Sequence, residues 1–339
     1  MSQSKYSLAV LLLSVAVTVH AGDREAREWL ERMSDSLTSR NYEGRYFHVR
    51  GAHTEEMRVI HRVERGKVTE RLVSLDGSGR EIIRNETEVV FYVPDQRTVL
   101  VEKREEQSTL LAAVPVYNER LESTYSIERG GATKTSGRRT QLILVKPRDQ
   151  FRYGYRLWLD HETAMPLKSQ LRDRSGNTIE QILFAELHFR DRISADSLKP
   201  AVSADGFRWH HQDAQEPRVR TASRDWNVIR LPAGFRLITW RTHAIEGSRA
   251  PVQHLVYSDG LASVSVFIEP RNPQTAAMRG LAKVGAAFAY SRDLDGYHQA
   301  TAVGVVPPAT VQAIASGVTK ERDAPAPSMS REPGAPATR

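Results

Sequence analysis

Apolar residues near the start of the chain recur at the three-four spacing of an amphipathic helix. The positions are Ala26, Trp29, Leu30, Met33 and Leu37. Asp23 precedes them and is a residue type that caps helix N-termini. The pattern predicts one helix that ends near Asn41 and whose apolar stripe needs a sheet to cover it.

A shorter period follows this helix. Apolar and polar residues alternate, as they do in half-buried strands, over segments 45–50, 56–64, 68–75, 80–84, 89–93 and 98–101. Turn-forming residues separate the segments, for example Asp76, Gly77, Ser78 and Gly79. Consecutive strands joined by short turns predict an antiparallel meander.

The stretch 107–120 interrupts the alternation with an apolar run that has no clean period. We interpret it as a short helix or a lid across one mouth of a curved sheet. Alternation returns in four further segments, which are 141–145, 151–159, 167–172 and 178–189.

His161 and Glu162, within WLDHETAMPLK, match the first two letters of a zinc-protease helix motif. That motif requires a second histidine where this chain has Met165, and Pro166 forbids a continuing helix. Because strand-like alternation flanks the stretch on both sides, we predict a turn between two antiparallel strands.

A drop in apolar density suggests a division into two folded units. We predict a large domain over 22–200, a linker over 201–225, a small domain over 226–319 and a disordered tail over 320–339. The linker holds His210 and His211, but adjacent strand residues point to opposite faces and no third ligand has suitable spacing, which argues against a metal site.

The small domain repeats the strand pattern, over segments 235–240, 253–257, 262–268, 286–290 and 297–305. Pro308 then starts a predicted helix with Val311, Ile314 and Val318 on one face. The fold class that we predict is α+β and mostly antiparallel β, with a large unclosed β-barrel plus helices and a smaller α+β C-terminal domain.

The N-terminus has the features of a secretory signal. Lys5 precedes an apolar run over 8–19, and small residues at Val19 and Ala21 suit signal peptidase, so we predict cleavage after Ala21. A short membrane anchor is the alternative. The chain has no cysteine, which excludes disulfides, thiolate chemistry and a lipid-modified cysteine. We therefore expect a soluble periplasmic protein that is not a lipoprotein.

The net charge of +7 suggests an anionic partner. In an exported protein, anionic lipid, lipopolysaccharide phosphates or an acidic protein segment fit better than nucleic acid. No phosphate-binding glycine loop or nucleophile elbow is present in the sequence, so we expect no enzyme, metal or cofactor. A catalytic triad assembled from distant residues stays open.

Several segments together resemble the RseB/MucB family of periplasmic regulators of the envelope-stress sigma factor. They are NYEGRYFHVR at Asn41, ERLVSLDGSGREIIR at Glu70, the long segment PRDQFRYGYRLWLDHETAMPLKSQLRDRSGNTIEQILF at Pro147, LPAGF at Leu231, YSDGLASVSVFIEP at Tyr257 and VGVVPPATVQAI at Val303. The resemblance implies a large domain similar to lipoprotein carriers, which is an unclosed antiparallel barrel plugged by helices, and a smaller C-terminal domain. It also implies that the protein binds and shields the periplasmic domain of a membrane-spanning anti-sigma factor, and releases it when lipid A, lipopolysaccharide or another lipid binds.

The resemblance and the apolar pattern together suggest site residues. The lipid-cavity candidates are Phe47, Phe91, Leu110, Leu111, Val114 and Tyr117. Sheet edges around Tyr257 and Phe267 are the candidates for partner binding. Homo-oligomers are compatible with the sequence. A periplasmic lipid or lipoprotein carrier and an envelope hydrolase are the alternative functions.

Overall fold

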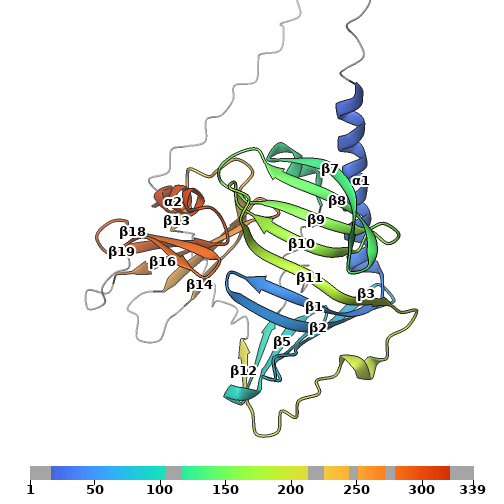
Figure 1. The fold of residues 1–339 in the computed structure, drawn as a ribbon. Coiled ribbons are helices and arrows are strands. Elements are labelled where there is room, and N and C mark those ends of the chain that lie inside the picture. The colour runs from blue at the N-terminus through green and yellow to red at the C-terminus, as the bar shows by residue number, and fades with distance from the viewer. Residues whose placement is uncertain (1–16, 104–116, 213–224, 244–250, 272–278, 321–339) are drawn as a thin grey trace, which may run out of the picture.

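The computed structural model describes residues 17–103, 117–212, 225–243, 251–271 and 279–320. The largest element is a curved sheet of 12 strands (Figure 1). In spatial order these are β12 (Arg208–Gln212), β6 (Thr98–Lys103), β5 (Glu88–Val93), β4 (Glu81–Arg84), β3 (Lys67–Ser74), β2 (His53–Glu64), β1 (Tyr42–Arg50), β11 (Thr178–Phe189), β10 (Pro166–Arg172), β9 (Gly154–Asp160), β8 (Arg138–Pro147) and β7 (Tyr125–Thr135).

This sheet is an unclosed antiparallel barrel. β12 and β7 are its two edges, and every pair is antiparallel except β12 with β6. Non-consecutive neighbours meet at β1 and β11, which pair from Tyr42 with Phe189 to Arg50 with Glu180. The mostly antiparallel, unclosed architecture confirms the predicted fold class.

Helix α1 (Val17–Ser39) covers part of the concave face, next to β7 and β8 (Figure 1). Its predicted apolar stripe forms one core with the sheet: Ala26, Trp29, Leu30, Met33 and Leu37 pack with residues such as Tyr42, Tyr46, Val59, Ile143 and Phe184. The predicted helix and its stripe are thus confirmed, and the helix ends two residues before the expected Asn41, but it begins at Val17, so Asp23 lies within the helix and does not cap it.

A second sheet has six strands and its own core. In spatial order they are β14 (Arg236–His243), β15 (Val252–Ser258), β16 (Ser263–Pro270), β19 (His298–Gly304), β18 (Ala287–Asp293) and β17 (Gly280–Val284). Helix α2 (Pro308–Ser316) and the pair β13 (Trp226–Val228) with β20 (Val318–Lys320) complete this core. Val318, expected on the helix, lies instead in β20, because the helix stops before Gly317.

The segment after β11 packs on the convex face of the large sheet. The segment contains the 3₁₀ helix η3 (Ala195–Leu198). After this helix, the apolar residues Val202, Ala204 and Phe207 pack against the buried side chains of β5 and β6. Glu81 accepts hydrogen bonds from the Ala201 amide at 3.1 Å and from Arg71 Nε at 2.8 Å. Part of the predicted linker therefore contributes β12 to the first sheet.

The turn between β9 and β10 was predicted from the sequence, whereas strand β7 was not. The turn from His161 to Met165 joins β9 to β10, as expected. β7 was not expected, because a register shift between Arg129 and Ala132 interrupts its alternation. Two short 3₁₀ helices, η1 (Pro94–Gln96) and η2 (Glu119–Ser123), precede β6 and β7.

Candidate functional site

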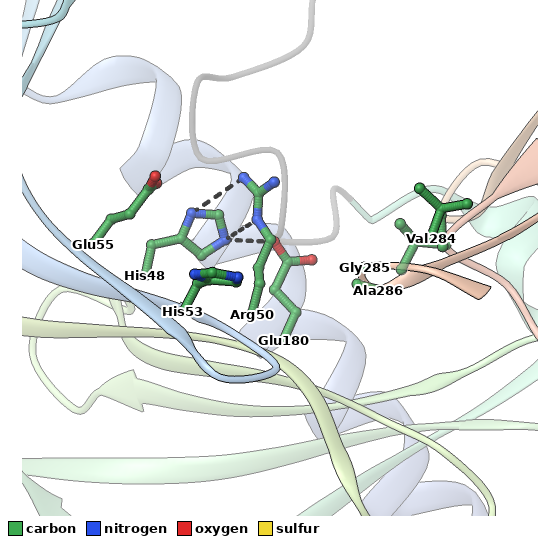
Figure 2. Close-up of a pocket in the computed structure, with 10 residues that line it drawn as sticks. His48, Arg50, His53, Glu55, Glu180, Val284, Gly285 and Ala286 are labelled. Carbon is green, nitrogen blue, oxygen red and sulfur yellow. Dashed lines mark hydrogen bonds and ion pairs between the residues drawn. The ribbon is translucent and has the colours of Figure 1, made fainter.

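A groove lies where hairpin tips of the two sheets approach each other. One part is a pocket of about 390 Å³ between the β1–β2 hairpin, β11 and the β17–β18 turn (Figure 2). The neighbouring part, of about 380 Å³, lies between the β10–β11 turn, the β17–β18 turn and the start of α2. Gly285 and Ala286 line both parts, so the β17–β18 turn separates two halves of one groove.

The large sheet supplies a polar wall to this groove. Glu180 Oε1 lies 2.5 Å from His48 Nε2 and 3.2 Å from Arg50 Nε, so the carboxylate bridges the two side chains. His53 and Glu55 extend the wall (Figure 2). The Arg50 side chain is more than half exposed, so it can contact an anionic group in the groove.

The small sheet supplies an apolar wall opposite. Val284 and Val305 are exposed to 58% and 38%, respectively, and both line the groove. Figure 2 shows Val284 across the open space from Arg50. A groove with one charged and one apolar wall suits a peptide segment with polar and apolar sides.

The concave face of the large sheet is apolar beyond the area that α1 covers. Ile82 pairs with Leu72 on one side and with Phe91 on the other, and Phe91 pairs with Leu100. Directly opposite residues of antiparallel strands share a face, so this half-buried apolar strip continues the face on which Leu72 and Val59 belong to the same core as α1.

A buried polar cluster interrupts this apolar face. Glu70 accepts from His61 Nδ1 at 2.7 Å and forms an ion pair with Arg84, and all three side chains are at most 4% exposed. The His61 ring stacks on Tyr42 at a centroid distance of 4.5 Å. Burial, together with the Glu70 carboxylate, raises the pKa of Tyr42 well above its usual value, so its hydroxyl stays protonated. This cluster was not predicted from the sequence.

The predicted lipid-cavity residues fall in three places. Phe91 lies on the concave face, and Tyr117 packs against the core under α1 and donates its hydroxyl to Glu122 at 2.7 Å. Phe47 differs from our expectation: its neighbour Tyr46 belongs to the core under α1, and strand alternation therefore turns Phe47 to the convex face. Leu110, Leu111 and Val114 lie outside the described residues.

The expectation of exposed sheet edges at Tyr257 and Phe267 needs correction. Their strands β15 and β16 are interior to the six-stranded sheet, and Tyr257 is 1% exposed within its core. Both strands pair on both sides, which their alternation alone could not indicate. Phe267 is half-buried on the other face, where it stacks on His254 at 4.4 Å.

The two sheets also contact each other through the turn between β15 and β16. Leu261 packs against the core of the large domain, and the backbone of Gly260 lies against η2. Gly260 has φ +102°, and a Cβ there would lie 2.9 Å from Asn118 Nδ2 and 3.4 Å from Leu121 Cδ2. Only glycine combines this backbone conformation with so close a contact.

We therefore expect Gly260→Ala to lower the free energy of unfolding by about 1–3 kcal/mol and to loosen the contact between the domains. Gly296→Ala is the matched control: it follows an aspartate in the turn between β18 and β19, has φ +82° and has no atom within 4 Å of the added methyl. Thermal unfolding of both variants separates backbone strain from the interdomain clash. Equal destabilisation would contradict a role for the close contact.

None of the described helices is both long and apolar enough to span a membrane. Within the described ranges, no group of three or more His, Asp or Glu side chains is arranged to hold a metal ion. His210 and His211 are both exposed on β12.

Comparison with known proteins gives matches along nearly the whole chain. The family model for the MucB/RseB N-terminal domain matches residues 25–202, and the model for the MucB/RseB C-terminal domain matches residues 220–319. The sigma factor AlgU regulatory protein MucB of Pseudomonas aeruginosa is 30% identical over 325 residues, which are 93% of this chain and 97% of that protein. The sigma-E factor regulatory protein RseB of Escherichia coli K12 is 24% identical over 94% of this chain and 98% of its own.

Solved structures give the same result. The complex of Pseudomonas aeruginosa MucA and MucB is similar with a TM-score of 0.69 and 28% identity, over 88% of this chain and 99% of that chain. A crystal structure of MucB in complex with MucA(peri) is similar with a TM-score of 0.68 and 29% identity, over 87% and 99%.

Proposed function

This chain belongs to the MucB/RseB family, and from that premise we propose that it is a periplasmic negative regulator that binds the periplasmic segment of a membrane-spanning anti-sigma factor. Bound protein would shield the segment from regulated proteolysis, and lipid or lipopolysaccharide would release it. The observation that carries the proposal is the match, over 87% of this chain, to MucB in complex with MucA(peri). Catalysis has no part in this function.

We place the anti-sigma segment in the groove between the two sheets. The polar wall carries Arg50 together with the carboxylates of Glu55 and Glu180, so it can pair with charged groups of a peptide, while Val284 and Val305 favour apolar ones. A segment that carries both kinds of side chain would bury the apolar wall and neutralise the polar one. Tyr257 and Phe267, predicted as partner contacts, do not line either part of the groove.

We place the lipid on the concave face of the large domain. Ile82, Phe91 and Leu100 offer half-buried apolar surface to acyl chains. A lipid that prefers the partner-free protein weakens partner binding by the same factor that the partner weakens lipid binding. The basic net charge of +7 is consistent with both ligands.

The test is binding of the purified protein, without its predicted signal segment, to the periplasmic segment of the organism's anti-sigma factor, by isothermal titration calorimetry. We expect binding that lipopolysaccharide micelles weaken at least about tenfold. Absence of binding to the segment, with lipopolysaccharide still captured, would contradict the regulator and favour the carrier. Measurable turnover of envelope substrates would favour the hydrolase.

A groove variant tests the placement of the segment. Ala286→Trp fills both halves of the groove, because Ala286 lines each of them. We expect its affinity for the anti-sigma segment to fall at least about tenfold, a loss of about 1.4 kcal/mol. Ala132→Trp on the exposed edge strand β7 adds the same side chain away from the groove and should bind normally. Unchanged affinity of the Ala286 variant would show that the segment binds outside the groove.

A further inference from the structure

We propose that Tyr125, Arg152 and Asp259 are positioning residues that transmit ligand occupancy of the concave face to the groove between the domains. The proposal rests on the regulatory function proposed above. It assigns the coupling between the two ligand sites to one hydrogen-bonded node, centred on the Asp259 carboxylate in the turn between β15 and β16.

The two oxygens of Asp259 serve different domains. Oδ1 accepts from the amides of Leu261 and Ala262, at 2.9 and 2.8 Å, and thereby fixes its own turn. Oδ2 accepts from the large domain, from Arg152 Nη1 at 2.7 Å and from the Tyr125 hydroxyl at 3.0 Å. The turn therefore follows any displacement of these two donors.

Arg152 is enclosed by both domains and has no exposed surface. It donates to Asp149 at 3.0 Å in its own loop and to the Ala233 carbonyl of the small domain at 2.5 Å. Its guanidinium also lies 5.3 Å from the Phe235 ring centre. A buried charge with this many partners has one favourable arrangement, because every displacement leaves part of the charge uncompensated.

Tyr125 connects this node to the concave face. Its ring is 1% exposed and belongs to the same core as Trp29 and Met33 of α1 and Leu121 of η2. Burial, with the nearby Asp259 carboxylate, raises the pKa of Tyr125, so the hydroxyl remains a hydrogen-bond donor. A ligand that shifts α1 from the sheet must repack this ring and change the geometry at Asp259.

The node also lies next to the groove. Gln150 and Tyr153, on the loop that carries Arg152, line its second half together with Pro308 at the start of α2. Thr310 Oγ1 donates to the Phe151 carbonyl at 2.6 Å, which ties the same loop to α2. A shift at Asp259 therefore alters the spacing between the two walls that the partner contacts.

Tyr125→Phe tests the coupling, because it keeps the ring and removes only the hydroxyl. We expect the variant to bind the anti-sigma segment and lipopolysaccharide separately, while the weakening of segment binding by lipopolysaccharide falls from at least about tenfold to less than about threefold. Tyr92→Phe is the matched control: it removes a tyrosine hydroxyl on the convex face of the large domain, away from the concave face and the groove, and it should keep the full weakening. An undiminished effect in Tyr125→Phe would overturn the proposal.

A second measurement does not depend on either ligand. The natural chain has no cysteine, so two introduced cysteines can be spin-labelled selectively. We choose Ala52→Cys in the β1–β2 turn and Tyr297→Cys on the small domain, where Tyr297 is 79% exposed. Pulsed electron paramagnetic resonance then measures the distance between the two labels, and so between the domains. We expect a broader distance distribution after Tyr125→Phe than in the parent or in Tyr92→Phe. Identical distributions would overturn the positioning role, whereas failure of the parent protein to bind the segment would overturn only the proposed function.

Discussion

Replacing Glu70 with alanine is expected to lower the free energy of unfolding of the large domain by about 3–5 kcal/mol. Glu70 is 1% exposed, and its carboxylate holds both Arg84 and His61. Removing one partner of a buried ion pair leaves the charge of the other without its main compensation, in a region where water cannot replace it. Equilibrium urea unfolding followed by tryptophan fluorescence gives the change.

Glu64→Ala is the control for this substitution. Glu64 also pairs with an arginine, Arg62, but its side chain is 63% exposed, so we expect a change within about 1 kcal/mol. If the two glutamate variants unfolded at the same urea concentration, the buried cluster would not stabilise the large domain. If only the Glu70 variant is destabilised, the buried cluster on the concave face contributes to the stability of the sheet.

Trp29→Ala is expected to destabilise the large domain by about 3–5 kcal/mol, which is typical of an aromatic core residue replaced by alanine. Trp29 is 7% exposed between α1 and the sheet, and its loss leaves a cavity that the strands cannot fill without moving. We expect faster tryptic cleavage of α1 at Arg27 and Arg32, because the helix separates from the sheet more often. Thermal unfolding and timed proteolysis measure both effects.

Arg32→Ala separates packing from surface contacts of the same tryptophan. The Arg32 guanidinium lies 4.4 Å from the Trp29 ring centre, and losing this cation–π contact costs about 0.5–1 kcal/mol. Destabilisation by Arg32→Ala as large as that by Trp29→Ala would show that α1 is not held by its apolar stripe.

The sequence predicted those parts of the fold whose pattern is local. The stripe of α1 and most strands follow directly from the spacing of apolar residues, because each needs only one buried face. β7 was missed where the bulge near Gly130 shifts its register, and an interruption of this kind looks like a loop in a single sequence. The position of a strand within a sheet is not encoded in its own alternation, which explains the wrong expectation of an edge at Tyr257.

The polar groups of the candidate sites were harder to predict. Glu70 has the same strand parity as Leu72, so a carboxylate on the apolar face could have been inferred from β3 alone. Its partners could not, because Arg84 and His61 reach it only through the register of three strands. Asp259 was not predicted as a site residue, since its interdomain contacts with Tyr125 and Arg152 join distant parts of the chain.

The pairing of β1 with β11 has a consequence for how the protein reaches this structure. β1 pairs on one side with its neighbour β2, but on the other side it pairs with β11, whose last residue is Phe189. The edge of β1 that faces β11 therefore stays unpaired until most of the domain has been synthesised. Contacts of such large sequence separation slow folding, and exposed strand edges favour association between incomplete chains. Chaperone assistance is therefore most valuable to this protein between the formation of the β1–β6 meander and the arrival of β11.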